Sequence, residues 1–289
     1  MSLAVVAGQG FLPRLVLDHL ETSGRPYFLC ELEGFPFVDR TGQPLIRFRI
    51  ETLGSFIAEL LDRGVDEICF AGQVGRPKLD PAAIDSATMP LVPRMMQALQ
   101  AGDDAALRLL LSFFNERGIV PVGAHDLRPD LLPEPGILGE IEPHEQHKSD
   151  AQRGVEIIAA MGAADVGQSC IVAGGQALAI EAMPGTDWMM QSLLTQAEPL
   201  RADLTAAFLG RGPSRRGPGV ADGGILVKAA KPGQELRVDM PVIGPDTIRR
   251  AAQVGLQGIV IEAGRVMIID TPLCVSLADR AGLFLWVMK

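Results

Sequence analysis

The chain is poor in cysteine, histidine and aromatic residues, and the first two shortages disfavour particular kinds of site. Its four cysteines are far apart and form no Cys-x-x-Cys pair, which disfavours a disulfide framework and a cysteine-based metal site. Four histidines, none with neighbours that suggest an activated serine or cysteine, leave no readable nucleophilic triad. We expect the cysteines to be small buried residues of a protein in a reducing compartment: Cys30, Cys69, Cys170 and Cys274.

The sequence also lacks a long apolar run and an excess of positive charge. No apolar run approaches the roughly 20 residues of a membrane-spanning helix, and no basic segment with an apolar signal core opens the chain. The formal net charge of −9 disfavours a general nucleic-acid binder, although it leaves room for a local cationic pocket. We therefore expect a cytoplasmic protein that binds no nucleic acid.

What the chain does contain is apolar sequence for two cores. Apolar residues make up 47% of its 289 residues, and this length favours two domains. In the first half, apolar strands alternate with helical patterns, which predicts an α/β fold with a doubly wound parallel sheet. Loops at the carboxyl ends of such strands form a crevice. The predicted strands are Leu3–Val6, Tyr27–Leu32, Glu67–Ala71 and Ile119–Val122.

A stretch rich in proline and glycine, from Pro129 to Pro143, separates this half from a different pattern. We predict a Rossmann-like nucleotide-facing domain over residues 1–133, a linker over 134–149 and a mixed α+β domain over 150–289. In the last of these we expect two hairpins and a closing strand: Cys170–Ala173 with Gln176–Glu181, Ile259–Glu262 with Val266–Ile269, and Leu283–Val287.

The stretch from Val227 to Gly244 carries the most suggestive chemistry. Lys228 and Lys231 precede a Pro-Gly turn, after which charged and apolar residues alternate as on a half-buried strand. The charged face of that predicted strand holds Glu235, Arg237 and Asp239. Two ammonium groups and a guanidinium suit a phosphate or diphosphate, and Asp239 is left as a magnesium ligand or general base. A solvated edge strand with surface charges is the alternative.

Two glycine loops follow predicted strands of the first domain. Gly8-x-Gly10 is similar to a dinucleotide-binding turn, and Glu31 at the end of the second strand could hold a ribose hydroxyl. Pro13 stands at the third glycine's place, so we interpret the loop as a backbone surface that faces a nucleotide. A tight strand-to-helix turn is the alternative. In the second loop, Gly72–Pro77, Arg76 could meet a phosphate.

Other motifs have structural explanations of comparable weight. A helix with Trp188, Met189, Met190, Leu193 and Leu194 indicates a core face or an acyl-chain groove. Asp103 and Asp104 favour a helix N-cap and its neighbour over a metal pair. The segment from Glu142 to His147 lacks the spacing of a zinc helix. We expect the loop Gly210–Gly224, with Arg211, Arg215 and Arg216, to be mobile.

Six stretches, spread over nearly the whole chain, together resemble the UDP-2,3-diacylglucosamine pyrophosphatases of lipid A synthesis of the type known as LpxI. They are Ala7–Pro13, Ala71–Pro77, Gly102–Asp104, Gly123–His125, Gly185–Asp187 and Lys228–Gly244. The resemblance implies a Rossmann-like domain followed by a domain of a less common fold. It also implies a magnesium-dependent hydrolysis that gives UMP and 2,3-diacylglucosamine 1-phosphate.

The resemblance places the family's essential aspartate at Asp239, which we expect to be catalytic and to bind the metal. Further catalytic candidates are Lys228, Lys231 and Arg237. Candidates for substrate binding are Gly8, Gly10, Phe11, Leu12, Gly72, Gln73, Val74, Arg76, Gln168, Thr186 and Asp187. Here Gln191-Ser192 stands where an arginine pair often follows the Gly-Thr-Asp turn.

Two other functions stay open at this point. One is a nucleotide-cofactor oxidoreductase with Glu31 on the ribose, and the other is a non-enzymatic carrier of a nucleotide lipid. The lipid substrate implies peripheral contact with the cytoplasmic face of the inner membrane. A homodimer is the expectation from the frequency of such assemblies.

Overall fold

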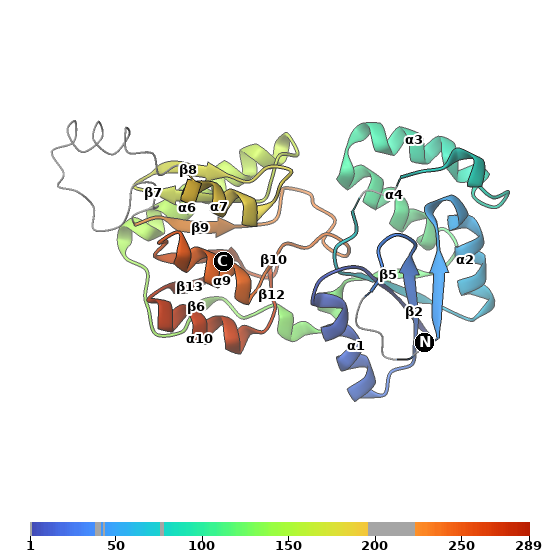
Figure 1. Cartoon of the computed structure of the whole chain (residues 1–289), viewed down its shortest axis with the longest axis horizontal. Coiled ribbons are helices and arrows are strands. Elements are labelled where there is room, and N and C mark those ends of the chain that lie inside the picture. Colours follow the sequence, from blue (N-terminus) through green and yellow to red (C-terminus); the bar gives the residue numbers. More distant parts are fainter. Residues whose placement is uncertain (1, 38–41, 43, 76–77, 196–222) are drawn as a thin grey trace. The chain divides into compact units, whose positions relative to one another are not determined.

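The computed structural model describes residues 2–37, 42, 44–75, 78–195 and 223–289 (Figure 1). The chain divides into two compact units. Unit 1 comprises Met1–Asp130 together with Glu235–Asp239, and unit 2 comprises Leu131–Gln234 and Met240–Lys289. Both units combine strands with helices, so the predicted α/β class is confirmed.

Unit 1 is built on a parallel sheet that, in the described part of the chain, has five strands in the order β3-β2-β1-β4-β5. β1 is buried throughout and lies at the centre, because its five residues are all small or branched apolar ones that fit between two neighbours. The strands are β1 (Leu3–Ala7), β2 (Tyr27–Leu32), β3 (Leu45–Phe48), β4 (Glu67–Ala71) and β5 (Val120–Val122).

The helices of unit 1 follow the predicted apolar periodicity. α1 has Pro13 in its first turn, where a missing N–H costs nothing, and ends at Gly24 in the left-handed conformation. Phe56 of α2 and Phe114 of α4 pack on the sheet in one core with Val6 and Ile68. The helices are α1 (Leu12–Ser23), α2 (Leu53–Asp62), α3 (Val92–Ala101), α4 (Asp103–Asn115) and α5 (Ala124–Leu127), with 3-10 turns at Ile50–Thr52, Pro81–Ala83, Met89–Leu91 and Pro129–Leu131.

Unit 2 contains a mixed sheet in the order β6-β13-β11-β9-β7-β8. Its three central strands are parallel, whereas β6 and β7 run antiparallel to their neighbours in the centre. The strands are β6 (Gly136–Leu138), β7 (Ser169–Ala173), β8 (Gln176–Ile180), β9 (Ile225–Lys228), β11 (Gly258–Glu262) and β13 (Phe284–Met288), and a separate parallel pair is formed by β10 (Val242–Ile243) and β12 (Met267–Ile268).

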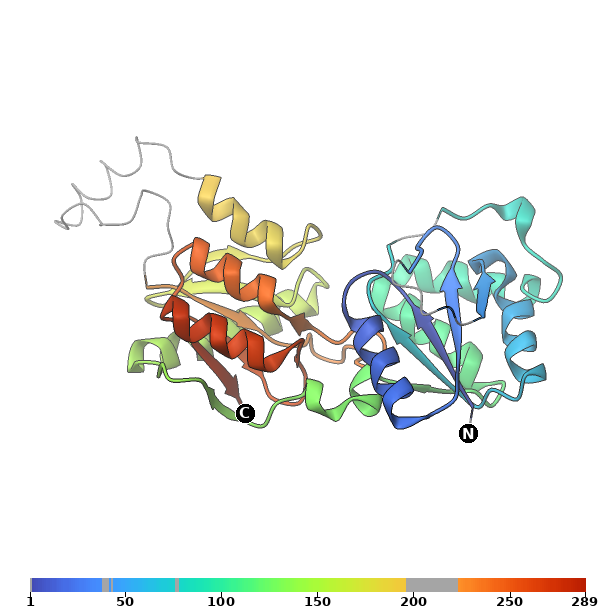
Figure 2. The same ribbon diagram turned by 60° about the horizontal axis from the view of Figure 1, so that its bottom comes forward.

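Helices cover both faces of this sheet. α6 (Glu145–Ala163) packs on one face through Ala151, Ile158 and Met161. The other face carries α7 (Thr186–Thr195), α9 (Pro245–Gln253) and α10 (Thr271–Ala281), which lie side by side in yellow, orange and red in Figure 2. The inner strands β7, β9, β11 and β13 are therefore mostly buried, which explains their continuous apolar runs, whereas the edge strands β6 and β8 are more exposed.

The first predicted hairpin is confirmed as β7 and β8, but the second is wrong. β11 has β9 on one side and β13 on the other, so both of its edges are occupied by parallel neighbours. Residues after the Ala263-Gly264 turn therefore pair elsewhere, and β12 lies beside β10. The run Gly258–Ile261 is fully buried, which is the pattern of a central parallel strand and not of a hairpin arm.

The segment predicted as a linker contributes to the sheet of unit 2. Residues 136–138 form β6, which pairs antiparallel with β13, and α6 begins at Glu145. Its proline and glycine residues are compatible with this because β6 is a short strand at the edge of the sheet. Richness in proline and glycine therefore does not distinguish a linker from a short edge strand in this segment.

All four cysteines are buried and free, as the sequence predicts. Burial raises the pKa of each thiol to about 12, so the reactive thiolate is scarce at neutral pH.

We expect the four cysteines of the native protein at pH 8 to leave an aromatic disulfide reagent essentially unreacted over minutes. After unfolding in guanidinium chloride, four thiols should react at once. Rapid reaction of the native protein would contradict this packing.

Candidate active site

Two glycine loops of unit 1 lie where a parallel sheet offers a binding crevice. β1 leads into Gly8–Gly10 and β4 leads into Gly72–Gln73, and these two strands are neighbours at the centre of the sheet. On either side of them the sheet continues in opposite directions, to β2 and to β5. Such a switch point, at the carboxyl ends of the strands, is the usual ligand-binding position in this class of sheet.

The two loops are fastened to each other through their backbones. Gln9 N donates to Gln73 O, and Gln73 N donates to Gln9 O, each over 2.8 Å. A Cβ atom on Gly8 would lie 2.7 Å from Gln73 O, and one on Gly72 would lie 2.6 Å from Gln9 O. Glycine is therefore required at both positions by close approach of the backbones.

The candidate binding residues of these loops differ in exposure. Gly10 has a φ of 95°, and beside it the Phe11 side chain is 69% exposed. Val74 is 42% exposed, and Leu12 is the first residue of α1. The loops thus present backbone and apolar side chains at the edge of the sheet. Arg76 lies outside the described residues.

Glu31 has a structural role that competes with the predicted ribose contact. Its carboxylate accepts a hydrogen bond from Phe37 N over 2.9 Å and one from Arg47 Nε over 3.2 Å. The residue is buried, with 4% of its surface exposed. This carboxylate stabilises the turn after β2, which removes the main sequence feature in favour of a cofactor-binding oxidoreductase.

The charged segment of residues 235–239 is a turn, so the predicted strand is wrong. Val238 N and Asp239 N both donate to Glu235 O, at 3.4 and 3.1 Å, and the backbone folds back on itself. Arg237 Nε and Nη2 donate to the two carboxylate oxygens of Glu235 over 2.8 and 2.7 Å. Alternation of charged and apolar residues fits a half-buried turn as well as a strand, and only pairing with a neighbour distinguishes them.

The Glu235–Arg237 pair changes the charge that this turn presents. Arg237 holds the pKa of Glu235 below its ordinary value, mainly through their hydrogen bonds. Conversely, Glu235 raises the pKa of Arg237 and compensates its positive charge. Asp239 is half-buried at the end of the turn.

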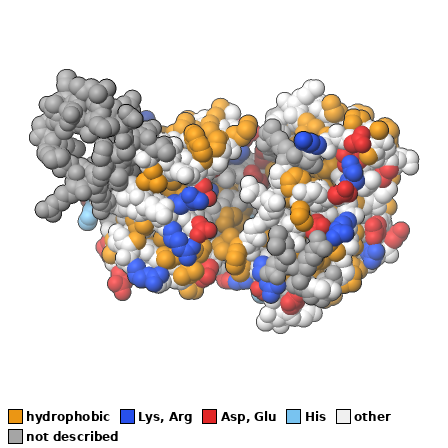
Figure 3. Space-filling view, viewed as in Figure 1, with side chains coloured by type: hydrophobic (Ala, Val, Ile, Leu, Met, Phe, Trp, Pro, Cys, Tyr) orange, Lys and Arg blue, Asp and Glu red, His pale blue; other side chains and the backbone are white. Residues whose placement is uncertain are grey.

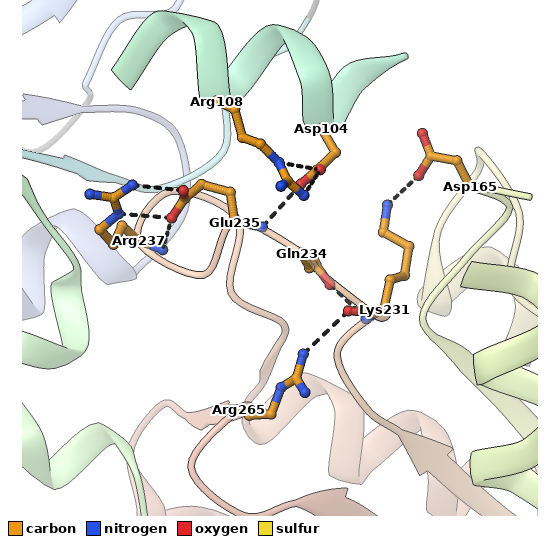
Figure 4. A network of polar contacts seen from close by, with 8 residues as sticks. All are labelled: Asp104, Arg108, Asp165, Lys231, Gln234, Glu235, Arg237 and Arg265. Atoms are coloured by element: carbon orange, nitrogen blue, oxygen red, sulfur yellow. Dashed lines mark hydrogen bonds and ion pairs between the residues drawn. The ribbon is translucent and has the colours of Figure 1, made fainter. Parts of the chain in front are cut away.

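Asp104 anchors this turn to α4 within unit 1, a role that the sequence did not reveal. Its Oδ1 accepts a hydrogen bond from Glu235 N over 3.0 Å, while Arg108 Nε donates to its Oδ2 over 2.8 Å (Figure 4). The N-cap position of α4 is occupied by Gly102 and the helix begins at Asp103, so the predicted N-cap at Asp103 is wrong by one residue. Asp104, predicted as the neighbour of the cap, instead contacts a residue far away in the sequence.

We expect Asp104→Ala to lower turnover about 10-fold, because the turn that carries Asp239 loses its side-chain anchor. Steady-state kinetics with the substrate proposed below, together with thermal unfolding, provide the measurement. Glu116→Ala is the matched control, since Glu116 also binds an arginine, Arg94, at the other end of α4. Unchanged turnover in Asp104→Ala would contradict the anchoring role.

Unit 2 gathers four polar side chains from four elements into one buried cluster. Lys228 is the last residue of β9, Thr186 the first of α7, Ser169 the first of β7, and Glu181 follows β8. Lys228 Nζ donates to Thr186 Oγ1 over 2.8 Å. Ser169 Oγ donates to Glu181 Oε2 over 2.7 Å, and Thr186 Oγ1 donates to Glu181 Oε1 over 3.0 Å. Lys228 is 6% exposed and Glu181 is 7% exposed.

A second polar group in unit 2 holds the loop after β9. Gln168 O accepts from Ala229 N over 3.1 Å, and Gln168 Oε1 accepts from Gln234 Nε2 over 3.0 Å. Lys231 pairs with Asp165, and its backbone oxygen accepts a bond from Arg265 (Figure 4). Four of the predicted site residues therefore lie in one hydrogen-bonded part of unit 2: Lys228, Lys231, Gln168 and Thr186. Asp187 forms an ion pair with Arg250 over 3.3 Å.

The methionine-rich helix α7 contributes mainly to the core. Met189, Met190 and Leu193 are buried against β9 and α9. Trp188 is 55% exposed, and Leu194 is also exposed. The core interpretation is therefore confirmed for the three buried residues. Arg211, Arg215 and Arg216 lie outside the described residues.

Glu181 and Ser169 are residues of these groups that the sequence did not single out, and Asp104 was singled out only as the neighbour of a helix N-cap. Glu181 ends an apolar strand shortly before the Gly-Thr-Asp turn, and that position is the only signal that could have drawn attention to it. A serine that opens an apolar strand carries no signal at all. These residues became apparent only through the hydrogen bonds that they form with other helices, strands and turns.

Within residues 2–37, 42, 44–75, 78–195 and 223–289, no group of three or more His, Cys, Asp or Glu side chains is placed to hold a metal ion. Magnesium needs no such group, since one or two carboxylates commonly hold it together with phosphate oxygens and water. One carboxylate such as that of Asp239 is therefore enough in principle for a magnesium ion that arrives with a phosphate-bearing ligand.

Basic and acidic side chains are interspersed over the face shown in Figure 3. None of the helices in the described part of the chain has the length and apolar character needed to cross a bilayer.

Comparison with known proteins gives matches along both units. The LpxI N-terminal domain model matches residues 2–131, and the LpxI C-terminal domain model matches residues 134–286. The UDP-2,3-diacylglucosamine pyrophosphatase LpxI of Caulobacter vibrioides is 37% identical over 284 residues. That alignment covers 98% of this chain and 95% of the relative.

Proposed function

Because this chain belongs to the LpxI family, we propose that it hydrolyses the diphosphate of UDP-2,3-diacylglucosamine in lipid A biosynthesis. The products are UMP and 2,3-diacylglucosamine 1-phosphate. The observation that carries this proposal is the match to a named UDP-2,3-diacylglucosamine pyrophosphatase over 98% of the chain. The buried lysine of unit 2 supports it, because a diphosphate needs such a cation.

The lysines of unit 2 neutralise the diphosphate in this proposal. Lys228 is held at the N-terminus of α7 by Thr186, so its charge adds to the partial positive charge of that helix end. Lys231 is paired with Asp165 and supplies a second ammonium group nearby in the sequence. Neutralising phosphate oxygens lowers the barrier because negative charge on the leaving phosphate is stabilised. Gln168 and Asp187 help to place these groups and the substrate.

Asp239 binds the metal or activates the attacking water. Magnesium, when bound, supplies further charge neutralisation at the phosphate oxygens. Arg237, which is already compensated by Glu235, keeps the turn in shape and contributes little net charge. Asp239 lies at the end of a short turn that is bound to α4 through Asp104. Arg108, on the same helix, holds the Asp104 carboxylate in place.

The glycine loops of unit 1 receive the nucleotide part of the substrate. Gly8, Gly10, Gly72 and Gln73 offer backbone at the switch point of the sheet, and their mutual hydrogen bonds preorganise them. Phe11, Leu12 and Val74 provide apolar surface beside it. Arg76 completes the set of proposed contacts.

A lipid substrate brings the protein to the cytoplasmic face of the inner membrane, and we place its activity there as a peripheral contact. We also propose that it acts as a homodimer. Flotation with vesicles that contain the substrate tests the first of these, and light scattering of the purified protein tests the second. No flotation, or a monomer at micromolar concentration, would contradict them.

Incubation of the purified protein with UDP-2,3-diacylglucosamine and magnesium tests the reaction. Chromatography of the products should show equal amounts of UMP and 2,3-diacylglucosamine 1-phosphate, and a chelator should stop their formation. Binding without cleavage, across several divalent metals, would instead identify a carrier. A chromophoric cofactor in the purified protein would identify an oxidoreductase.

A further inference from the structure

Glu181 binds several parts of the buried cluster at once. Its carboxylate accepts hydrogen bonds from Ser169 Oγ, from Thr186 Oγ1 and from the backbone N of Gln168, the last over 3.2 Å. Its own backbone N donates to Ser169 O over 2.9 Å. β7, the end of β8 and the first residue of α7 therefore meet at one side chain.

The carboxylate also decides which way the Thr186 hydroxyl group points. A hydroxyl group has one hydrogen to donate and two lone pairs with which to accept. An ionised carboxylate can only accept, so the hydrogen of Thr186 is directed to Glu181 and the lone pairs remain for Lys228. Ser169, which lies 3.3 Å from Thr186 Oγ1, is oriented by Glu181 in the same way.

The charges of the cluster are complementary as well. A buried ammonium group is costly unless a counter-charge or hydrogen bonds compensate it. Thr186 links the buried ammonium of Lys228 to the buried carboxylate of Glu181 through two hydrogen bonds of 2.8 and 3.0 Å. The other charge at this end of α7, Asp187, is paired with Arg250 and belongs to a different interaction.

We propose that Glu181 is a positioning residue for the reaction, which acts through the Thr186 hydroxyl to fix the Lys228 ammonium as a charged donor. Ser169 is its partner in this role. The inference rests on the proposed function, because it concerns the same lysine. It adds that the phosphate-neutralising cation depends on a carboxylate that itself touches no substrate.

Glu181→Gln is the test variant, because it keeps the shape of the side chain and removes its charge. The amide must donate through its nitrogen, so one of the two hydroxyl groups has to reverse its direction. We expect kcat to fall about 10- to 100-fold while KM changes less than about threefold. Asp150→Asn is the matched control, since Asp150 is a fully buried carboxylate of unit 2 that binds the backbone N of Gly174 and Gly175.

A double-mutant cycle separates a positioning role from a loss of fold. In a Lys228→Met background, Glu181→Gln should reduce kcat by less than about threefold further, because its effect passes through the missing ammonium. Thr186→Ser keeps the hydroxyl group and should restore most of the activity that Thr186→Val loses. Independent, multiplying effects of Glu181 and Lys228 would overturn the proposal.

Chemical labelling measures the coupling between Glu181 and the Lys228 ammonium group without substrate. Competitive acetylation at pH 8, followed by mass spectrometry, compares Lys228 with the exposed Lys148 as internal reference. In Glu181→Gln the relative labelling of Lys228 should rise several-fold, because a buried amine without its counter-charge loses its proton more readily. Asp150→Asn should leave it unchanged.

The outcomes of the two measurements distinguish the two proposals. Wild-type protein that labels as expected but cleaves no UDP-2,3-diacylglucosamine contradicts the proposed function. Active wild-type protein, with Glu181→Gln of unchanged kcat or unchanged Lys228 labelling, contradicts the role of Glu181.

Discussion

Replacing Asp239 by asparagine is expected to lower kcat by about 1,000-fold, a larger effect than we expect from Lys228→Met, Glu181→Gln or Asp104→Ala. The amide has nearly the same shape as the carboxylate but is a poor ligand for magnesium and a poor base for water. A loss of this size corresponds to about 4 kcal/mol of transition-state stabilisation, which is within the range for a group that holds a catalytic metal.

The measurement is steady-state hydrolysis of UDP-2,3-diacylglucosamine over a range of magnesium concentrations. A metal ligand and a general base give different results in this series. If Asp239 binds the metal, part of the activity of Asp239→Asn should return as magnesium is raised, whereas the loss of a base persists at every concentration.

Asp62→Asn, an exposed residue at the end of α2, is the control for Asp239→Asn and should keep wild-type kinetics. Thermal unfolding should change little for Asp239→Asn, because Asp239 is only half-buried. Full activity in a folded Asp239→Asn protein would remove this carboxylate from the mechanism.

Replacing Lys228 by methionine is expected to lower kcat/KM by about 100-fold. Methionine fills a similar volume without the charge, so the phosphate loses a buried cation whose effect is strengthened by exclusion of water. Stability should also fall, because Glu181 keeps its hydrogen bonds but loses the compensating charge near it. Kinetics and thermal unfolding therefore have to be measured on the same preparations.

Lys148→Met provides the matched control for Lys228→Met. Lys148 lies on the surface of α6 and pairs with Glu145, an exposed interaction that contributes little to stability. This variant should keep both its activity and its melting temperature. A Lys228→Met protein that is folded at the assay temperature and has wild-type kcat/KM would contradict the role assigned to the buried ammonium.

The two parts of the charged stretch from Val227 to Gly244 belong to different units of the fold. Lys228, Lys231 and Gln234 belong to unit 2, whereas residues 235–239 are grouped with unit 1, to which Asp104 fastens them. Sequence proximity suggested a single strand that would present lysines and carboxylates together. The structure instead supports the lysines by one set of contacts and Asp239 by another.

Much of the fold was predictable because it follows from local patterns. Runs such as Leu3–Ala7 are apolar at every position, and only a strand with neighbours on both sides and cover on both faces accommodates them. Pro13 and Gly24 mark the ends of α1 by their backbone preferences alone. These signals depend on adjacent residues, so they survive without any knowledge of tertiary structure.

The errors occurred where the choice of partner decided the outcome. Ile259–Glu262 could have formed a hairpin, but β9 and β13 occupy both of its edges. Residues 235–239 alternate like a strand, yet with no ladder to join they close into a turn through Glu235 O. Whether a segment forms a strand depends on which other segments lie beside it in the folded protein, and the local sequence does not specify those neighbours.

The sequence by itself determined the class of the fold, the burial of the four cysteines, the glycine loops and the identity of the charged residues. Only the tertiary structure decided that Asp104 binds the backbone of Glu235, and that the carboxylate of Glu181 accepts from both Ser169 and Thr186 while Thr186 accepts from Lys228. The physical reason is that propensity and periodicity act between near neighbours in the chain. The direction of a buried hydrogen bond is set by side chains that folding brings together from distant elements.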